Sequence, residues 1–163
     1  MILEQLINPG SVLCNVHARS KKHSVDILSE LLANPNPDIS HEEIFAKLIA
    51  RERLGCTSLD KGIAFPHGRI SSVQGSCGAL MKLSEAVDFD SPDGVSVDLI
   101  FGLILPTELD DSHYSDIEMI TSFLTNDSLA AKLRSANSSS ELYDALLAGH
   151  VPAGTKLKSV QTL

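Results

Sequence analysis

The chain has 163 residues, 43% of them hydrophobic and 21% charged, so we expect one globular domain and exclude collagen, coiled coil and wholesale disorder. A chain of this length buries roughly 70% of its unfolded surface, which supports a core without a structural metal or disulfide. The 13 Lys and Arg against 21 Asp and Glu give a net charge of −8, which argues against nucleic acid and anionic membranes as partners.

The first third of the chain predicts a short strand and two helices. Residues 11–16 fit a strand, and from Ser20 the apolar residues recur at spacings of three and four, as they do on a helix face. Pro35 ends this pattern because it disfavours helix in the residue before it and has no backbone N–H to donate. Ser40 and Glu43 then form a capping box at the start of a second apolar helical face.

The middle of the chain is dominated by strand patterns. Residues 62–65 and 78–83 are short apolar runs, and the segment 91–94, Ser-Pro-Asp-Gly, is typical of a turn. Residues 95–105 are almost entirely apolar after Asp98, which predicts a strand buried on both faces.

The last third returns to helix. Apolar residues at helical spacing occupy 117–124 and again 129–133, and Ser138 with Glu141 forms a second capping box before an apolar run that ends near Gly149. Helices therefore flank a central group of strands without strict alternation. We predict a single α/β (α+β) domain over residues 1–149, with a mixed β-sheet flanked by helices on both sides, and a flexible tail over residues 150–163.

The sequence predicts a soluble, cytoplasmic protein. Its longest apolar stretch, Leu99 to Leu105, is far shorter than the roughly 20 residues of a membrane-spanning helix. The segment that starts at Met1 has no basic region before an apolar run, so we expect no signal peptide and no membrane insertion. The three cysteines form no C-x-x-C pair and are interpreted as reduced thiols, with the redox sensitivity of Cys56 left open.

Among the six histidines, His67 has the most informative surroundings. It follows the apolar run Gly62-Ile-Ala-Phe-Pro66 and precedes Gly68, so we expect its imidazole on a tight turn at the end of the sheet, within reach of a macromolecular partner. The residues alone leave open whether His67 acts chemically or only caps a loop. We expect no direct role for four other histidines, His17, His23, His41 and His150.

Two further residues are candidates for the same site. His113 stands at the start of a predicted helix, where the helix dipole and free N–H groups favour phosphate, although a solvated N-terminal histidine has the same pattern. Arg51 lies late in the helix that leads toward His67, and a surface ion pair is its simpler explanation.

Other chemistries lack their usual motifs. Zinc sites take three or four protein ligands, usually at short spacing, and no cysteine lies within four residues of His67 or His113. The chain contains no H-E-x-x-H, G-x-S-x-G, Walker or G-x-G-x-x-G sequence, which argues against a zinc protease, a serine hydrolase, a nucleotide-binding enzyme and a Rossmann dehydrogenase. We therefore expect no metal and no cofactor.

Residues 51–69, which read Arg-Glu-Arg-Leu-Gly-Cys-Thr-Ser-Leu-Asp-Lys-Gly-Ile-Ala-Phe-Pro-His-Gly-Arg, resemble the active-site segment of enzyme IIA of the fructose/mannitol class. These proteins are phosphocarrier domains of the phosphoenolpyruvate-dependent phosphotransferase system (PTS). The resemblance continues through residues 97–106, a histidine that opens a helix, and residues 133–143, and it covers roughly residues 1–148. Within the family the chain is most similar to the free-standing nitrogen-regulatory IIA branch.

The resemblance implies roles for the candidate residues. His67 matches the histidine that accepts a phosphoryl group through Nε2 from an HPr-like carrier, His113 matches the second active-site histidine, and Arg51 matches the supporting arginine. It also implies a mixed sheet between helices and no metal or nucleotide. Two departures are visible, since residues 58–61 replace a more glycine-rich stretch and Arg69 stands where lysine is common.

Three hypotheses stay open at this point. The protein is a regulatory phosphocarrier with one or more target proteins, or a sugar-transport component that passes phosphate from His67 to a separate IIB protein, or a binding module that keeps the fold without taking phosphate. The absence of an appended IIB domain favours the first, and the pair His67 and His113 argues against the third. In each phosphocarrier scheme, Nδ1 of His67 needs a hydrogen-bond acceptor that keeps Nε2 free, and the sequence does not identify it.

Overall fold

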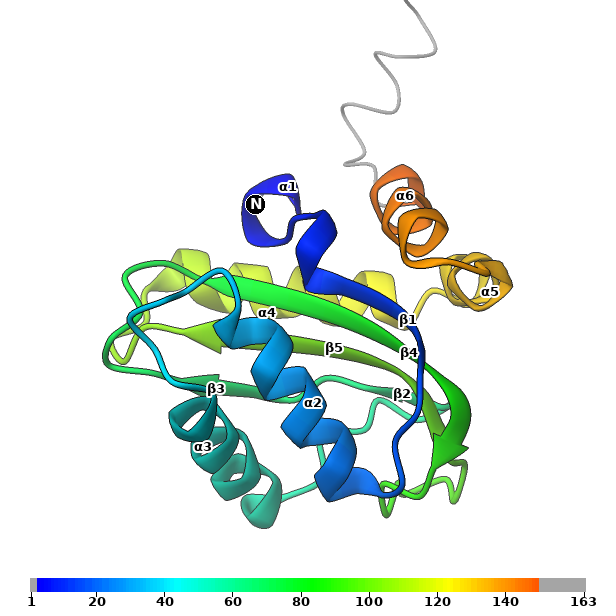
Figure 1. The fold of residues 1–163 in the computed structure, drawn as a ribbon, viewed down its shortest axis with the longest axis horizontal. Helices are drawn as coiled ribbons and strands as arrows, with labels where there is room; N and C mark the ends of the chain where they lie inside the picture. Colours follow the sequence, from blue (N-terminus) through cyan, green and yellow to red (C-terminus); the bar gives the residue numbers. More distant parts are fainter. Residues whose placement is uncertain (1–2, 150–163) are drawn as a thin grey trace, which may run out of the picture.

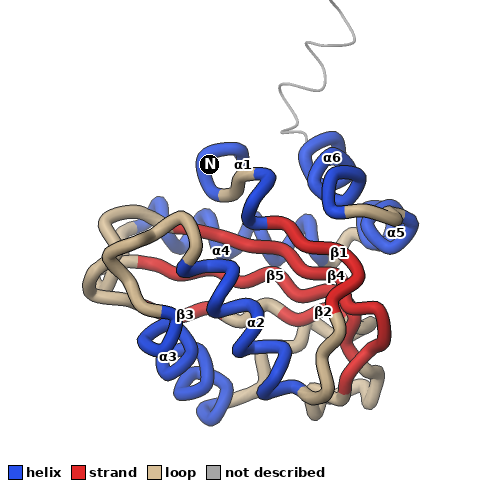
Figure 2. Tube along the Cα trace, in the orientation of Figure 1, coloured by secondary structure: helices blue, strands red, loops and turns tan. Residues whose placement is uncertain are grey.

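Strand β5 (Val97–Leu105) lies in the middle of the sheet in the computed structural model, which describes residues 3–149. It pairs antiparallel with β4 (Cys77–Val87) on one side and parallel with β2 (Ile63–Ala64) and β3 (His67–Arg69) on the other. The edge strand β1 (Val12–Val16) runs parallel to β4, so the order is β1-β4-β5-β2, with β3 also paired to β5 (Figure 2). The sheet is therefore mixed, as predicted.

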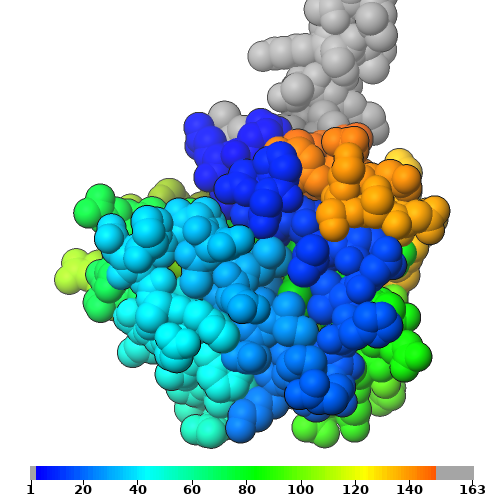
Figure 3. Space-filling view, viewed as in Figure 1, coloured from blue at the N-terminus to red at the C-terminus, as the bar shows by residue number. Residues whose placement is uncertain are grey.

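Helices α2 (Lys21–Ala33) and α3 (His41–Leu54) cover one face of this sheet (Figure 1). The space-filling view shows their side chains, coloured blue to cyan, over most of that face (Figure 3). Their buried leucine and isoleucine residues pack against strand residues that include Met81, Ile100 and Ile104. Burial of these apolar side chains stabilises the contact between helices and sheet by roughly 1.5–3 kcal/mol for each fully buried side chain.

The opposite face carries the C-terminal helices and the start of the chain. These elements pack against the alternate residues of β5, including Leu99, Phe101 and Leu103, which point away from α2 and α3. They are α4 (Asp111–Leu124), α5 (Asp127–Ser135), α6 (Ser139–Gly149), α1 (Leu3–Leu6) and the single 3₁₀ turn η1 (Pro9–Ser11). The prediction of helices on both sides of the sheet is confirmed, and β5 is buried on both faces as expected.

The predicted helix starts are confirmed by their capping bonds. The hydroxyl of Ser20 accepts a hydrogen bond from the amide of His23 at 3.1 Å, and the hydroxyl of Ser40 accepts one from the amide of Glu43 at 3.0 Å. Helix α2 ends at Ala33, before the Asn-Pro repeat. Within residues 3–149, no helix combines the length and apolarity needed to cross a lipid bilayer. The tail predicted over residues 150–163 lies outside the described residues.

The prediction that His67 lies on a tight turn is wrong, because His67 begins β3 and pairs with Leu103 of β5. Strands β2 and β3 follow the same side of β5 and are separated only by Phe65 and Pro66. Proline has no N–H to give to the ladder, but the amide of Leu103 donates to the carbonyl of Pro66 at 3.0 Å, so the chain stays beside β5.

Candidate functional site

The ring of His67 is oriented by the backbone carbonyl of Phe65, which lies 2.8 Å from Nδ1. A carbonyl oxygen only accepts hydrogen bonds, so Nδ1 carries the proton in this geometry. In the neutral ring, Nε2 then holds an unshared electron pair and acts as a base or nucleophile. The Phe65 ring also contacts the imidazole, with 4.9 Å between the ring centroids, and restricts its rotation.

The surroundings of His67 favour the neutral form of its ring. Burial is the largest effect and lowers the pKa from 6.5, because the charged imidazolium loses hydration. The nearby Arg51 cation lowers the pKa further, while the hydrogen bond to Phe65 and the carboxylate of Glu52 raise it. The net shift of the pKa is downward, so Nε2 keeps its lone pair at neutral pH.

His67 opens into a cleft of about 430 Å³ between α3, β3 and α4. Three cationic side chains, Lys47, Arg51 and Arg69, line this cleft together with apolar groups, so it suits an anion presented by a partner. The lining residues are Lys47, Ala50, Arg51, Leu54, His67, Gly68, Arg69, Leu105, Leu109, Tyr114 and Ile117.

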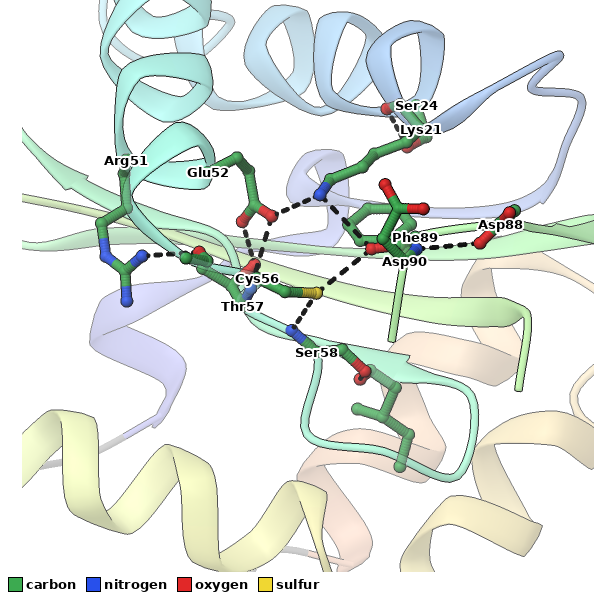
Figure 4. A network of polar contacts seen from close by, with 12 residues as sticks. Lys21, Ser24, Arg51, Glu52, Cys56, Thr57, Ser58, Asp88, Phe89 and Asp90 are labelled. Carbon is green, nitrogen blue, oxygen red and sulfur yellow. Dashed lines mark hydrogen bonds and ion pairs between the residues drawn. The ribbon is translucent and has the colours of Figure 1, made fainter. Parts of the chain in front are cut away.

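Arg51 lies in the last turn of α3, late in this helix as predicted, and lines the cleft. Its Nη1 donates to the carbonyl of Gly55 at 2.9 Å, so one edge of the guanidinium fixes the end of the helix (Figure 4). A guanidinium carries five N–H donors, and this bond uses one of them, which leaves others for an anion in the cleft.

His113 lies beside the cleft, but it is not one of the residues that line it. It stands in the first turn of α4, one residue before Tyr114, and its side chain is 18% exposed. Nδ1 of His113 accepts the amide hydrogen of Asp110 at 3.1 Å, in a reciprocal capping box. This acceptor role places the ring proton on Nε2, which is then available as a donor.

The carboxylate of Asp110 completes the start of α4. It accepts hydrogen bonds from the amide and hydroxyl of Ser112 and from the amide of His113. The bond from the Ser112 hydroxyl has the largest effect and lowers the pKa of this exposed carboxyl group. Asp110 therefore stays ionised and keeps the turn that carries His113 and Tyr114 in place.

The remaining described histidines take part in contacts outside the cleft. His41 pairs with the carboxylate of Asp26 at 2.8 Å, His23 accepts the amide hydrogen of Arg19, and His17 lies 3.0 Å from the hydroxyl of Ser84. His150 lies outside the described residues. Between residues 3 and 149, no three His, Cys, Asp or Glu side chains are grouped in a way that would hold a metal ion. The three cysteines are free thiols.

A larger cleft of about 660 Å³ lies at the end of β1 and the start of α2. Its lining residues carry charges of both signs, since Arg19 and Lys21 belong to it together with Glu85 and Asp88. It contains none of the predicted site residues. All of its lining residues belong to the described part of the chain, and none of them has a buried side-chain polar atom without a partner that would point to a ligand.

Leu54 and Tyr114 are among the residues of the His67 cleft that were not identified from the sequence. The side chains of Leu54 and Tyr114 are large and apolar, yet they are 85% and 51% exposed. Such residues at the rim of a charged cleft are typical of protein-binding surfaces. Leu54 could have been recognised as an apolar residue at the polar end of a helix, but the place of Tyr114 depends on how α4 packs.

Comparison with known proteins identifies the family. The family model described as "Phosphoenolpyruvate-dependent sugar phosphotransferase system, EIIA 2" matches residues 5–149. The chain belongs to this family. The resemblance inferred from the sequence is thereby confirmed.

Relatives of the EIIA 2 protein include several nitrogen regulatory proteins. The protein of that name from Pseudomonas aeruginosa is 38% identical over 86% of this chain and 92% of its own length, and the one from Escherichia coli K12 is 30% identical over 86% of each. The crystal structure of nitrogen regulatory protein IIA-Ntr from Neisseria meningitidis superposes with a TM-score of 0.83 at 29% identity, over 90% of this chain and 99% of that one.

Proposed function

We propose that this EIIA 2 protein is a cytoplasmic phosphocarrier that accepts a phosphoryl group on Nε2 of His67 from an HPr-like protein and acts as a regulatory, nitrogen-type IIA protein. The observation that carries the proposal is the 2.8 Å contact between Nδ1 of His67 and the carbonyl of Phe65. This contact keeps the proton on Nδ1 and leaves the electron pair of Nε2 free to attack phosphorus. A histidine that only caps a loop has no need of a free electron pair on Nε2.

The transfer balances without a metal, a nucleotide or a net proton. The electron pair of Nε2 attacks the phosphorus atom of a phosphohistidine on the carrier, an N–P bond forms to His67, and the N–P bond of the donor breaks. The donor nitrogen keeps the electron pair of the broken bond, and Nδ1 of His67 keeps its proton. The transition state places negative charge on the three phosphoryl oxygens, so catalysis consists of positioning and electrostatic stabilisation.

We propose that two side chains assist this step. Arg51 shares the cleft with His67 and offers cationic N–H donors to the phosphoryl oxygens. His113 is held by its capping bond in the tautomer that donates from Nε2, and we propose that it hydrogen bonds to the phosphoryl group when the partner is docked. We expect His113→Ala to slow the transfer while leaving the fold intact.

A transport role is the alternative that a specific observation favours. The chain is also 30% identical, over 90% of its length, to the PTS 2-O-alpha-mannosyl-D-glycerate-specific EIIABC component of Escherichia coli K12, but it spans only 22% of that protein. The greater similarity to nitrogen regulatory proteins over nearly their whole length supports the regulatory role. In a transport role, phosphate would pass from His67 to a cysteine of a separate IIB protein.

The test is phosphoryl transfer in vitro. The protein is mixed with phosphoenolpyruvate, enzyme I and an HPr-like carrier, and any acid-labile adduct is located by mass spectrometry. We expect a single adduct on His67 and none in His67→Ala, with His41→Ala as a control variant that retains the adduct. Full phosphate uptake by His67→Ala would disprove the assignment. Failure of the wild-type chain with several carriers would favour a binding module instead.

A further inference from the structure

Glu52 is the only charged residue whose side chain is buried in the described part of the chain. Its carboxylate accepts hydrogen bonds from the amide and the hydroxyl of Thr57 and pairs with Nζ of Lys21 at 2.9 Å (Figure 4). Burying a carboxylate is unfavourable unless its oxygens are paired and hydrogen bonded, and an apolar side chain would often be as stable. Stability alone therefore does not account for this buried ion pair, which points to a role in positioning neighbouring groups.

A continuous series of hydrogen bonds leads from Glu52 to the ring of His67. Glu52 holds Thr57 through two donors, and the carbonyl of Thr57 accepts the amide hydrogen of Phe65 at 3.0 Å. The carbonyl of Phe65 in turn accepts the Nδ1 hydrogen of His67 at 2.8 Å. Only backbone groups lie between Thr57 and the ring, so a displacement of Thr57 moves the acceptor that selects the tautomer of His67.

The same carboxylate fixes its surroundings from a second side. Lys21 reaches Glu52 from the start of α2 and also donates to the carbonyl of Phe89 at 3.3 Å. The thiol of Cys56, next to Thr57, donates to this same carbonyl at 3.1 Å (Figure 4). Through Lys21, Glu52 thus connects α2 and α3 to the segment after β4 that contains Phe89. These elements surround residues 55–62, the loop between α3 and β2.

We propose that Glu52 is a positioning residue for the phosphoryl-acceptor histidine: through Thr57 and Phe65 it holds His67 in the tautomer with the proton on Nδ1. The proposal rests on the proposed function of His67 for its catalytic consequence. Without Glu52, the Phe65 carbonyl is less well placed and the ring spends part of its time protonated on Nε2, a form that has no electron pair there to attack phosphorus. The charge of Glu52 also reaches the ring, since it raises the pKa of His67 against the effects of burial and Arg51.

The variant Glu52→Gln tests the proposal with little change in volume. With the amide oxygen of glutamine in the place of Oε1, its NH₂ group faces the Thr57 hydroxyl, which then accepts instead of donating, and Lys21 loses its charged partner. Thr57→Val removes only the hydroxyl contact and keeps the backbone bonds to Phe65. Asp26→Asn is the matched control, because Asp26 forms a half-exposed ion pair with His41 between the same two helices and lies outside the series.

Two readouts separate positioning from general stability. Long-range ¹H–¹⁵N NMR spectra of the imidazole report which nitrogen of His67 is protonated, without any phosphate. We expect mostly protonated Nδ1 in the wild type and in Asp26→Asn, and a clear rise in protonated Nε2 in Glu52→Gln with a smaller rise in Thr57→Val. Transfer from the carrier should slow about tenfold in Glu52→Gln, while the carrier concentration for half-maximal rate stays unchanged because Glu52 is buried.

The outcomes distinguish the two proposals. A folded Glu52→Gln with the wild-type tautomer and transfer rate overturns the role of Glu52. Should this variant fail to fold, the wild-type tautomer and rate in Thr57→Val overturn it equally. If instead no carrier phosphorylates the wild type, the proposed function fails, whereas a tautomer shift in Glu52→Gln still supports Glu52 as the residue that orients His67.

Discussion

The tautomer of His67 depends on a carbonyl group two residues before it. Phe65 and Pro66 occupy the break between β2 and β3, and this break turns the Phe65 carbonyl out of the sheet ladder toward Nδ1 of His67. The candidate histidine was predictable from the sequence because Pro and Gly flank it. Its tautomer was not, because the acceptor is a backbone group whose direction depends on the path of the chain.

The lowered pKa of His67 has two consequences for pH dependence. The folded protein loses the neutral ring only below pH 6.5, so we expect phosphate acceptance to persist below the pH at which a free histidine is half protonated. Between the lowered pKa and 6.5 the unfolded chain binds a proton that the folded chain does not, so this residue makes stability fall as the pH decreases through that window.

An NMR titration of the His67 ring checks this prediction directly. We expect its pKa below 6.5 in the wild type and a higher pKa in Arg51→Gln, because the variant removes a cation that disfavours the charged ring. A wild-type pKa at or above 6.5 would contradict the described surroundings.

The loop before β2 contains three consecutive residues with left-handed backbone, Asp60, Lys61 and Gly62, with φ of 67°, 56° and 81°. Lys61 is held there by its amide, which donates to the Asp93 carboxylate at 2.7 Å, and by its carbonyl, which accepts from Arg134 at 2.8 Å. The backbone therefore keeps a shape that disfavours a lysine side chain.

We expect Lys61→Gly to be more stable than Lys61→Ala by about 0.5–1 kcal/mol. Both variants lose the exposed ion pair with Asp127, which contributes little, and only glycine relieves the left-handed strain of roughly 1–2 kcal/mol, partly offset by the greater entropy of its unfolded chain. Urea unfolding of the two variants measures the difference. Equal stability, or a more stable alanine variant, would show that the loop carries no such strain.

The packing of α2 on the sheet depends on the absence of a side chain at Gly102 of β5. A Cβ atom there would lie 2.7–2.9 Å from three side-chain carbons of Leu28, one of which is Cγ close to the helix backbone. We expect Gly102→Ala to destabilise the protein by about 1–3 kcal/mol, because α2 must move to make room. Leu28→Ala alone should cost about 2–5 kcal/mol through a cavity.

The double variant tests whether these two residues are in direct contact. Its destabilisation should be smaller than the sum of the single effects, since the new methyl group fills part of the space that Leu28 leaves. Gly75→Ala is the control: no atom lies within 4 Å of its Cβ position, and we expect a change below about 1 kcal/mol. Simple additivity in thermal unfolding would exclude the contact.

The elements that were predictable are those with local signals. Helices α2 and α3 have serine caps and apolar faces in one continuous stretch, and β5 is apolar throughout after Asp98. The short strands β2 and β3 contain two and three residues, too few for any periodicity, and β3 is a strand only because Leu103 is available beside it. The prediction of a tight turn at His67 was wrong because three residues are too few to show a strand pattern in the sequence.

In the complete fold, the two faces of one sheet contribute to two separate apolar clusters. In β4, Leu80 belongs to the cluster with the C-terminal helices and Met81 to the cluster with α2 and α3. Neither cluster can lose its strands without disrupting the other. We therefore expect the full chain to unfold in a single thermal transition, with equal calorimetric and van't Hoff enthalpies; two resolved transitions would contradict a single domain.

The arrangement of the cleft could not be predicted from the sequence, because it is a property of the complete fold. Arg51 and His67 line the same cleft because α3 packs beside β3. Leu54 and Tyr114 line it from α3 and α4, and the start of α4 lies 57 residues after the end of α3. The family resemblance supplied three residues for one site. Of these, the structure brings Arg51 and His67 into the cleft and leaves His113 at its side, engaged in the cap of α4.

The proposed phosphoryl transfer requires that Nε2 of His67 receives the group because Nδ1 is bonded to Phe65. This requirement is tested by ³¹P–¹H and ¹H–¹⁵N NMR spectra of the protein after phosphorylation by an HPr-like carrier, with ¹⁵N-labelled histidine. We predict one phosphorylated residue, His67, with phosphorus on Nε2 and the proton retained on Nδ1. Phosphorus on Nδ1, or on any other histidine, would contradict the proposed chemistry.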